Sequence, residues 1–268
     1  MNTAWKQQLM CAAVTLALAA CGGGLSPETS DAEDAVETSS ATSGESALLS
    51  SAAEDSTANA STMSDDQIAE AASARLTGKF KSGCVTATRA LNVVTYVMVD
   101  CTGPYGLVHV SGTMVVTYTR QADGSVKAVG SGTGLQVNGG TLDLDATAIY
   151  SRNAAGLETA NVETHGKGTG PRGNTADRTG SYVVTRDQAA GCVTLDGTWS
   201  TQWNGGRLTS STEVTGLKKC TASCPAAGGV ITHTGVYGNV ITVTLDGSAV
   251  ARWTTSKGKS GTINLQCK

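Results

Sequence analysis

The chain has 268 residues, with 19 Lys and Arg against 22 Asp and Glu, and a formal net charge of −3. Aromatic residues make up only 4% of it, and no run of Lys and Arg exceeds two residues. This charge distribution gives no support for a nucleic-acid-binding protein.

Residues 1–21 have the layout of a secretory signal: Lys6 in a short n-region, an apolar stretch over 9–20, and small residues before the end. The apolar stretch is too short to span a bilayer. Its last four residues, Leu18-Ala19-Ala20-Cys21, resemble the lipobox of bacterial lipoproteins. The resemblance implies removal of residues 1–20 and a membrane anchor of lipid chains on Cys21. The Gly after Cys21, where a retention signal would have Asp, favours the outer membrane, facing the periplasm or the cell surface.

Residues 21–63 are predicted to form a lipid-anchored, disordered acidic tether. The segment consists mainly of Gly, Ser, Thr, Ala, Asp and Glu, and it lacks the apolar surface that a folded core requires. It carries eight acidic residues and no Lys or Arg. Removing these eight acids and Lys6 from the chain totals leaves 14 acids and 18 bases, a net charge of +4, in residues 64–268. We therefore expect a mildly basic domain on an acidic tether.

The domain is expected to begin with a short helix over residues 64–78. Ser64 can serve as N-cap and Gln67 can complete a capping box. Ile68, Ala72 and Leu76 then lie on one face at a helical spacing.

An internal repeat dominates the rest of the chain. Residues 194–198 (TLDGT) match residues 244–248 (TLDGS), and each segment precedes a Trp at the same offset, Trp203 and Trp253. Residues 141–143, followed by Tyr150, form a weaker copy, and residues 109–113, followed by Tyr118, a still weaker one. Alternate residues in each copy are apolar or small, which predicts strands with one buried face. The Gly within three of the copies is expected to mark a bend, a bulge or a close backbone approach.

Turn signals follow each copy, so the domain is predicted to be all-β: an antiparallel meander of long hairpins that closes as a barrel or folds as a sandwich. Residues 64–268 would form this one disulfide-bonded domain.

Six cysteines remain after Cys11 and Cys21, and an even number in an exported domain indicates disulfides. Hairpin geometry favours Cys84–Cys101 and Cys192–Cys220, which leaves Cys224–Cys267. The alternative pairs Cys220 with Cys224 and Cys192 with Cys267. A redox pair at Cys220 and Cys224, or a zinc site that adds His233 and Cys267, lacks the usual spacing of such sites.

The sequence contains no established catalytic motif, and no cofactor or metal is expected. Residues 256–259 (SKGK) fit Ser-x-x-Lys, but they lie in a predicted turn. Residues 165–173 (HGKGTGPRG), with Lys167, Arg172 and Arg178, could cradle an anion, although a surface loop is the simpler interpretation. Asp143 and Asp145 could act as paired acids or bind calcium, but no third carboxylate lies nearby in the sequence, so a solvated polar face is the better interpretation. Structural roles are expected for the histidines, His109, His165 and His233.

Three hypotheses for function remain. The first is a non-enzymatic binding or structural domain of the cell envelope, with envelope proteins or glycans as partners. The second is a β-barrel carrier of an apolar ligand bound near Trp199, Trp203 and Trp253, with small residues such as Ala148, Ala249 and Ala251 leaving room inside. The third is a hydrolase in which a His, an acid and a Ser converge from separate strands.

Overall fold

The computed structural model describes residues 62–79, 83–102, 109–137, 139–153, 156–169, 173, 175–187, 189–220 and 224–265, with only the backbone described for 75–79, 102 and 109. The signal peptide, Cys21 and nearly all of the predicted tether lie outside these residues. The elements are α3 (Asp65–Lys79), β1 (Val85–Ala90), β2 (Val93–Thr102), β3 (His109–Arg120), β4 (Val126–Val137), β5 (Gly140–Arg152), β6 (Glu158–Thr169), β7 (Thr175–Asp187), β8 (Cys192–Trp203), β9 (Leu208–Cys220), β10 (Val230–Thr234), β11 (Val240–Leu245), β12 (Val250–Thr255) and β13 (Ser260–Asn264).

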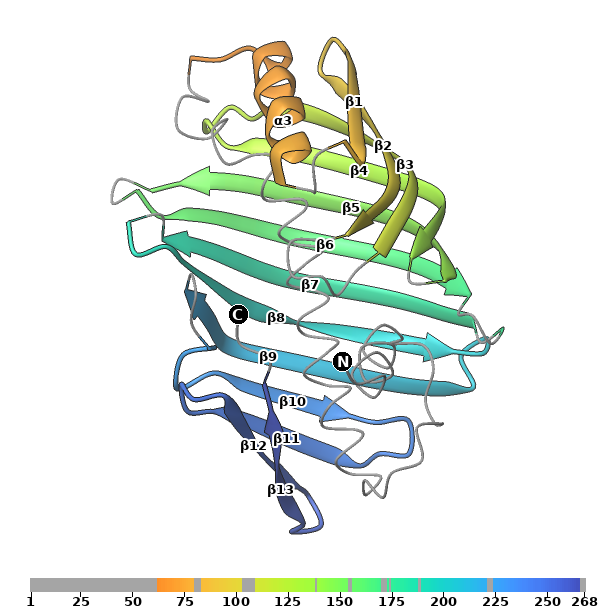
Figure 1. Ribbon diagram of the computed structural model, residues 1–268, viewed down its shortest axis with the longest axis vertical. Coiled ribbons are helices and arrows are strands. Elements are labelled where there is room, and N and C mark those ends of the chain that lie inside the picture. The colour runs from red at the N-terminus through yellow and green to blue at the C-terminus, as the bar shows by residue number, and fades with distance from the viewer. Residues whose placement is uncertain are drawn as a thin grey trace, which may run out of the picture.

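All thirteen strands belong to one antiparallel sheet, in which the spatial order β1 to β13 follows the chain order. The all-β meander predicted from the sequence is confirmed. The predicted closure as a barrel is wrong, because β1 and β13 do not pair and the sheet stays open. The alternative, a sandwich of two sheets, is also wrong, because all the described strands belong to one sheet. Figure 1 shows α3 beside β1 at one end of the sheet and β13 at the other. Local alternation of apolar residues shows which face of a strand is buried, whereas closure depends on the tilt and stagger of all the strands together.

One face of the sheet, here called the inner face, carries the core. Its buried side chains form a single apolar cluster that extends from Ile68 of α3 to Ile263 of β13. Two tyrosines from neighbouring strands, Tyr96 and Tyr118, are fully buried there with their hydroxyls 3.2 Å apart. Burial raises the pKa of both phenols, so they stay neutral hydrogen-bonding groups inside the core.

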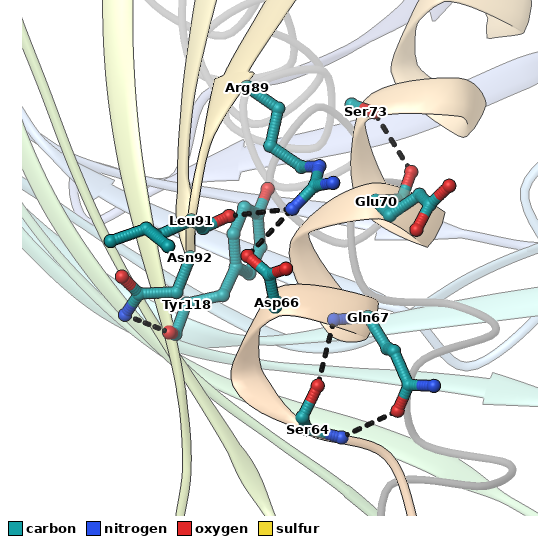
Figure 2. A network of polar contacts seen from close by, with 9 residues as sticks. All are labelled: Ser64, Asp66, Gln67, Glu70, Ser73, Arg89, Leu91, Asn92 and Tyr118. Atoms are coloured by element: carbon teal, nitrogen blue, oxygen red, sulfur yellow. Dashed lines mark hydrogen bonds and ion pairs between the residues drawn. The ribbon is translucent and has the colours of Figure 1, made fainter.

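The helix begins where the sequence predicts, and it covers β1 to β3. The backbone N–H of Ser64 donates to Oε1 of Gln67 at 2.9 Å, and the N–H of Gln67 donates to Oγ of Ser64 at 3.3 Å (Figure 2). This is the reciprocal capping box, which supplies acceptors for otherwise unpaired N–H groups. Ile68, Ala69 and Ala72 are fully buried. Asp66 of the helix also pairs with Arg89 of β1 at 2.6 Å.

In three copies of the internal repeat, the third residue caps a β-bulge in the neighbouring strand. Ser111, Asp143 and Asp196 each lie opposite a one-residue bulge in a neighbouring strand, in β2, β4 and β9 respectively. In each case the side-chain oxygen accepts the N–H of a bulge residue with positive φ: Ser111 from Asp100 at 2.8 Å, Asp143 from Gly134 at 2.7 Å, and Asp196 from Gly216 at 2.6 Å. The repeat therefore encodes a strand that caps a bulge beside it.

The remaining copy of the repeat, residues 244–253, does not form a continuous strand. β11 ends at Leu245 and β12 begins at Val250, with a turn between them. Asp246 accepts the N–H of Ser248 at 3.0 Å within its own turn, and Gly247 has φ +87°. Ala249, expected on a buried face, is exposed. The same Thr-Leu-Asp-Gly sequence thus forms a strand in β8 and a turn here.

Two disulfides join Cys84 to Cys101 and Cys192 to Cys220. Both are pairs that the hairpin argument favours. Each links residues at or beside the ends of paired strands, and Cys192 and Cys220 are direct partners in the ladder of β8 and β9. Cys224 is also disulfide-bonded. Its expected partner, Cys267, lies outside the described residues, so that third pairing stays a prediction.

Candidate functional site

The face opposite the core, here called the outer face, is the candidate binding surface. Across β7 to β10 it presents two parallel rows of short polar side chains that run perpendicular to the strands. Cross-strand pairing places Thr179, Ser200, Ser211 and Thr234 in one row, and Ser181, Thr198, Glu213 and Thr232 in the other. Neighbours along a row are about 4.8 Å apart, and the rows are separated by two residues, about 7 Å.

A groove of about 420 Å³ lies between these two rows, and we call it the hydroxyl furrow. Its floor is formed by Gly180, Trp199 and Thr212, the residues between the two rows on β7, β8 and β9. Trp199 is only 4% exposed and Thr212 only 3%, so they belong to the inner face and reach the furrow chiefly through their backbone. Thr179 and Ser200 lie 3.3 Å apart across the strands, oxygen to oxygen. The furrow therefore offers mainly hydroxyl donors and acceptors.

A second groove, of about 360 Å³, crosses the outer face towards one end of the same strands, and we call it the acidic furrow. It contains Asp143, Lys167 and Asp177, with the glycines of the β8–β9 turn, Gly205 and Gly206, at its rim. The Nζ of Lys167 lies 3.5 Å from Oδ2 of Asp177. The Nε2 of His165 lies 2.9 Å from Oδ1 of the same carboxylate. The hydrogen bond with His165, and to a lesser extent the charge of Lys167, lowers the pKa of Asp177 below its ordinary value.

Negative charge predominates on the outer face of β5 to β9, although residues 64–268 have a net charge of +4. Among the described residues, the strand register places seven carboxylates there and two cations, Lys167 and Lys218. The carboxylates belong to Asp143, Asp145, Glu163, Asp177, Asp187, Asp196 and Glu213. Such a face repels polyanions and suits a neutral or cationic partner.

Residues 165–169, interpreted from the sequence as part of a surface loop, belong to β6, and the alternative anion cradle is not assembled by its described cationic residues. Arg178 lies on the inner face, 5.3 Å above the ring of Trp199, where it makes a cation–π contact. Lys167 is paired with Asp177 on the opposite face. Arg172 lies outside the described residues. The guanidinium group of Arg178 and the ammonium group of Lys167 therefore lie on opposite sides of the sheet.

The three tryptophans predicted to bind a ligand are dispersed along the inner face. Trp199 and Trp253 are each 4% exposed, and Trp203 is half-buried and donates from Nε1 to Oγ of Ser210 at 3.2 Å. The open sheet removes the closed barrel that the carrier hypothesis requires. Of the three, only Trp199 contributes to the two furrows described here.

The described histidines, His165 and His233, lie on opposite faces of the sheet. The side chain of His109 lies outside the described part of the chain. His233 is half-buried on the inner face, with Nδ1 2.9 Å from Oγ1 of Thr212, and burial lowers its pKa. His165 has Asp177 as an acid partner and Thr179 as its cross-strand neighbour.

The Ser-x-x-Lys match and the two aspartates Asp143 and Asp145 have structural surroundings of their own. Residues 256–258 form the turn between β12 and β13, as predicted, so the Ser-x-x-Lys match is not on a helix. Asp143 caps a bulge instead of pairing with Asp145. Within the residues that the structure describes, no three His, Cys, Asp or Glu side chains are grouped so that they could hold a metal ion. In the same residues, no helix has both the length and the apolar character needed to cross a membrane.

The rows of the hydroxyl furrow were not identified from the sequence. β7, β8 and β10 each contribute two outward Ser or Thr residues, and β9 contributes Ser211 and Glu213. Such residues are common on any solvated strand face. What joins them into rows is the register between strands, which is set in part by the bulges. The sequence could have indicated the rows in one way: the outward Ser and Thr residues would have to lie the same number of residues from the turn on both strands of each hairpin.

No family model matches the chain, and neither the curated proteins nor the solved structures give a match. The architecture itself defines the class: an open, single-sheet antiparallel β-meander with an apolar inner face and an outer face that is furrowed and mainly polar across β7 to β10.

Proposed function

We propose that this chain is a lipid-anchored protein of the bacterial cell envelope, attached through Cys21 to the outer membrane. The Leu18-Ala19-Ala20-Cys21 motif supports the anchor, and the disulfides Cys84–Cys101 and Cys192–Cys220 support an oxidising compartment. Labelling with an alkyne fatty acid in cells tests this anchor. Labelled protein is expected for the natural chain and none for the Cys21→Ser variant; labelling of that variant would contradict the proposal.

The folded domain acts as a non-enzymatic binding module, and its ligand is an extended neutral glycan lying in the hydroxyl furrow. The observation that carries this proposal is the pair of Ser and Thr rows that border the furrow. Hydroxyl groups both donate and accept, which suits a chain of sugar hydroxyls, and short side chains lose little conformational entropy on binding. Glu213 in one row adds a carboxylate, which accepts stronger hydrogen bonds than a neutral oxygen does.

The charge on the outer face narrows the ligand to chains without acidic groups. Glu163 and Glu213 lie in the same cross-strand row, and no Lys or Arg lines the furrow. A phosphate-bearing or uronic-acid-rich polymer would therefore be repelled.

Calorimetric titration of the purified chain tests the site. The probes are a neutral β-linked oligomer of N-acetylglucosamine and, for comparison, an oligogalacturonate. The Thr198→Val, Thr232→Val double variant removes two hydroxyls but keeps the β-branched shape. Thr113→Val with Thr117→Val makes the same change on β3, away from the furrow. We expect the neutral oligomer to bind the natural chain and the β3 control equally, and the furrow variant at least tenfold more weakly. Binding of the acidic oligomer alone, or equal binding by all three proteins, would overturn the proposal.

A further inference from the structure

An open sheet has two edges, and in this protein they differ. At one end the edge strand is β1, and at the other it is β13; among the described strands, neither pairs on its free side. An edge strand presents unpaired N–H and C=O groups that can pair with another chain.

The backbone of β13 directs its free polar groups outward in a defined pattern. The N–H of Thr255 donates to the carbonyl of Lys259 at 2.8 Å, and the N–H of Leu265 donates to the carbonyl of Ala249 at 2.7 Å. Along an antiparallel ladder, pairs of residues that are hydrogen-bonded to each other alternate with pairs that are not. These two bonds therefore show which residues of β13 are hydrogen-bonded to β12. Ser260, Thr262 and Asn264 are the alternate residues, so their N–H and C=O groups point away from β12.

The edge at β1 is protected by a charged side chain. The N–H of Val99 donates to the carbonyl of Cys84 at 2.9 Å, so Val85, Ala87 and Arg89 are the residues whose backbone groups face outward. The Arg89 guanidinium is held between Asp66 of α3, at 2.6 Å, and the carbonyl of Leu91, at 3.1 Å (Figure 2). A fixed charge on an edge strand is a common means of preventing strand addition. Pairing of β13 with β1 of another copy, which would propagate into a filament, is therefore disfavoured.

We propose that β13 pairs antiparallel with β13 of a second copy, about a two-fold axis at Thr262. In this register Thr262 lies opposite its own symmetry mate and Ser260 lies opposite Asn264. The strand sequence, Ser-Gly-Thr-Ile-Asn, contains no charged residue that would be repelled by its copy. Ile263 of each copy would lie opposite Gly261 of the other, beside the indole of Trp253, which already covers Gly261.

The product is a closed dimer with a continuous sheet across both copies. Because β13 has only five residues, the interface is small, and we expect a dissociation constant in the micromolar range. The proposal does not depend on the glycan site, which lies on β7 to β10.

Introducing a charge at Thr262 tests this register. The Thr262→Lys variant places two ammonium groups opposite each other at the axis, and Thr262→Glu places two carboxylates there. Sedimentation velocity of the full chain, in a density-matched detergent, measures the association. We expect reversible dimers for the natural chain and for the Thr262→Val control, a dissociation constant at least tenfold higher for each charged variant alone, and restored dimers in their equimolar mixture.

Recovery on mixing is the decisive observation, because a variant that had lost its fold would not recover. A natural chain that stays monomeric up to about 100 μM would overturn the proposal. Charged variants that dimerise as well as the natural chain, or a mixture that stays monomeric, would do the same.

Discussion

The carboxylate of Asp143 accepts the backbone N–H of Gly134 on the neighbouring strand, with 2.7 Å between oxygen and nitrogen. Gly134 has φ +64° and is the second of two residues that face the single residue Asp143. The bulge turns this N–H out of the ladder, and the carboxylate replaces the carbonyl that the ladder would have supplied. A bulge so capped has one fixed position, which pins the register of β4 against β5.

Replacing Asp143 with Ala is therefore expected to destabilise the domain by about 1.5 kcal/mol, the lower end of the typical net contribution of a hydrogen bond to a charged group. Asp145 is on the same strand and the same face, but it lies opposite Ser131 in the regular ladder. Asp145→Ala is the matched control and should change stability by less than about 0.5 kcal/mol. Urea unfolding followed by tryptophan fluorescence measures both. Equal effects for the two variants would contradict the capping role.

Gly197 and Gly247 occupy the same place in the repeat, and the same substitution should affect them differently. A Cβ at Gly197 would lie 2.6 Å from Cα of Tyr182, so the backbones of β7 and β8 would have to separate. We expect Gly197→Ala to destabilise by about 3 kcal/mol. At Gly247 a Cβ would lie 3.5 Å from its nearest neighbour, and only the φ of +87° opposes it, at a cost of about 1 kcal/mol.

Both values come from the same unfolding experiment. A Gly197→Ala protein as stable as Gly247→Ala would show that β7 and β8 are not in this close contact.

The His165–Asp177 pair predicts a dependence of stability on pH. The hydrogen bond with His165 is the main cause that lowers the pKa of Asp177, with Lys167 contributing less. The folded state therefore binds this proton less readily than the unfolded chain does. Its contribution to stability is fully present above the unfolded value, about 3.9, and disappears as the pH falls through the lower folded pKa.

Unfolding of Asp177→Asn, compared with the natural chain between pH 6 and pH 2, measures this contribution. The difference in unfolding free energy should be constant above about pH 5 and should shrink below about pH 4. Asp145→Asn, on the next row of the same face, serves as the control. A difference between Asp177→Asn and the natural chain that grows as the pH falls would have the wrong sign for this explanation.

Removing both cysteines of one disulfide should be costly for either pair. For Cys192→Ala with Cys220→Ala, and separately for Cys84→Ala with Cys101→Ala, we expect a loss of about 2–4 kcal/mol. The two pairs close loops of similar length, with sequence separations of 28 and 17, so the chain-entropy difference between them is only about 0.4 kcal/mol. Denaturant unfolding without reductant measures both. A loss below about 1 kcal/mol for either pair would contradict the prediction.

Those features of the fold that depend on neighbouring residues could be predicted from the sequence. The capping box of Ser64 and Gln67 is encoded within four residues, and the inward alternation of Val116 and Tyr118, or of Ala148 and Tyr150, is encoded within one strand. The open sheet could not be predicted, because no segment contains the information on whether β1 meets β13.

The turn at Asp246 shows how a reliable repeat can mislead. In β8, Thr-Leu-Asp-Gly is followed by Thr198 and Trp199, both strong strand formers, and the chain stays extended. In the later copy it is followed by Ser248 and Ala249, which are weak strand formers, and Asp246 caps a turn instead. The residues after the shared motif decided its structure. For the same reason the furrow on the outer face, which depends on register among four strands, was not foreseen.

The strict chain-order arrangement of the thirteen strands has a consequence for how such a protein can vary. Each strand touches its sequence neighbours in the ladder, so a hairpin can be gained or lost without rethreading the rest of the chain. A closed barrel lacks this freedom, because its strand number fixes its diameter. In an open meander, the length of the polar surface across the strands can therefore grow or shrink one hairpin at a time, while the apolar layer beneath it stays continuous.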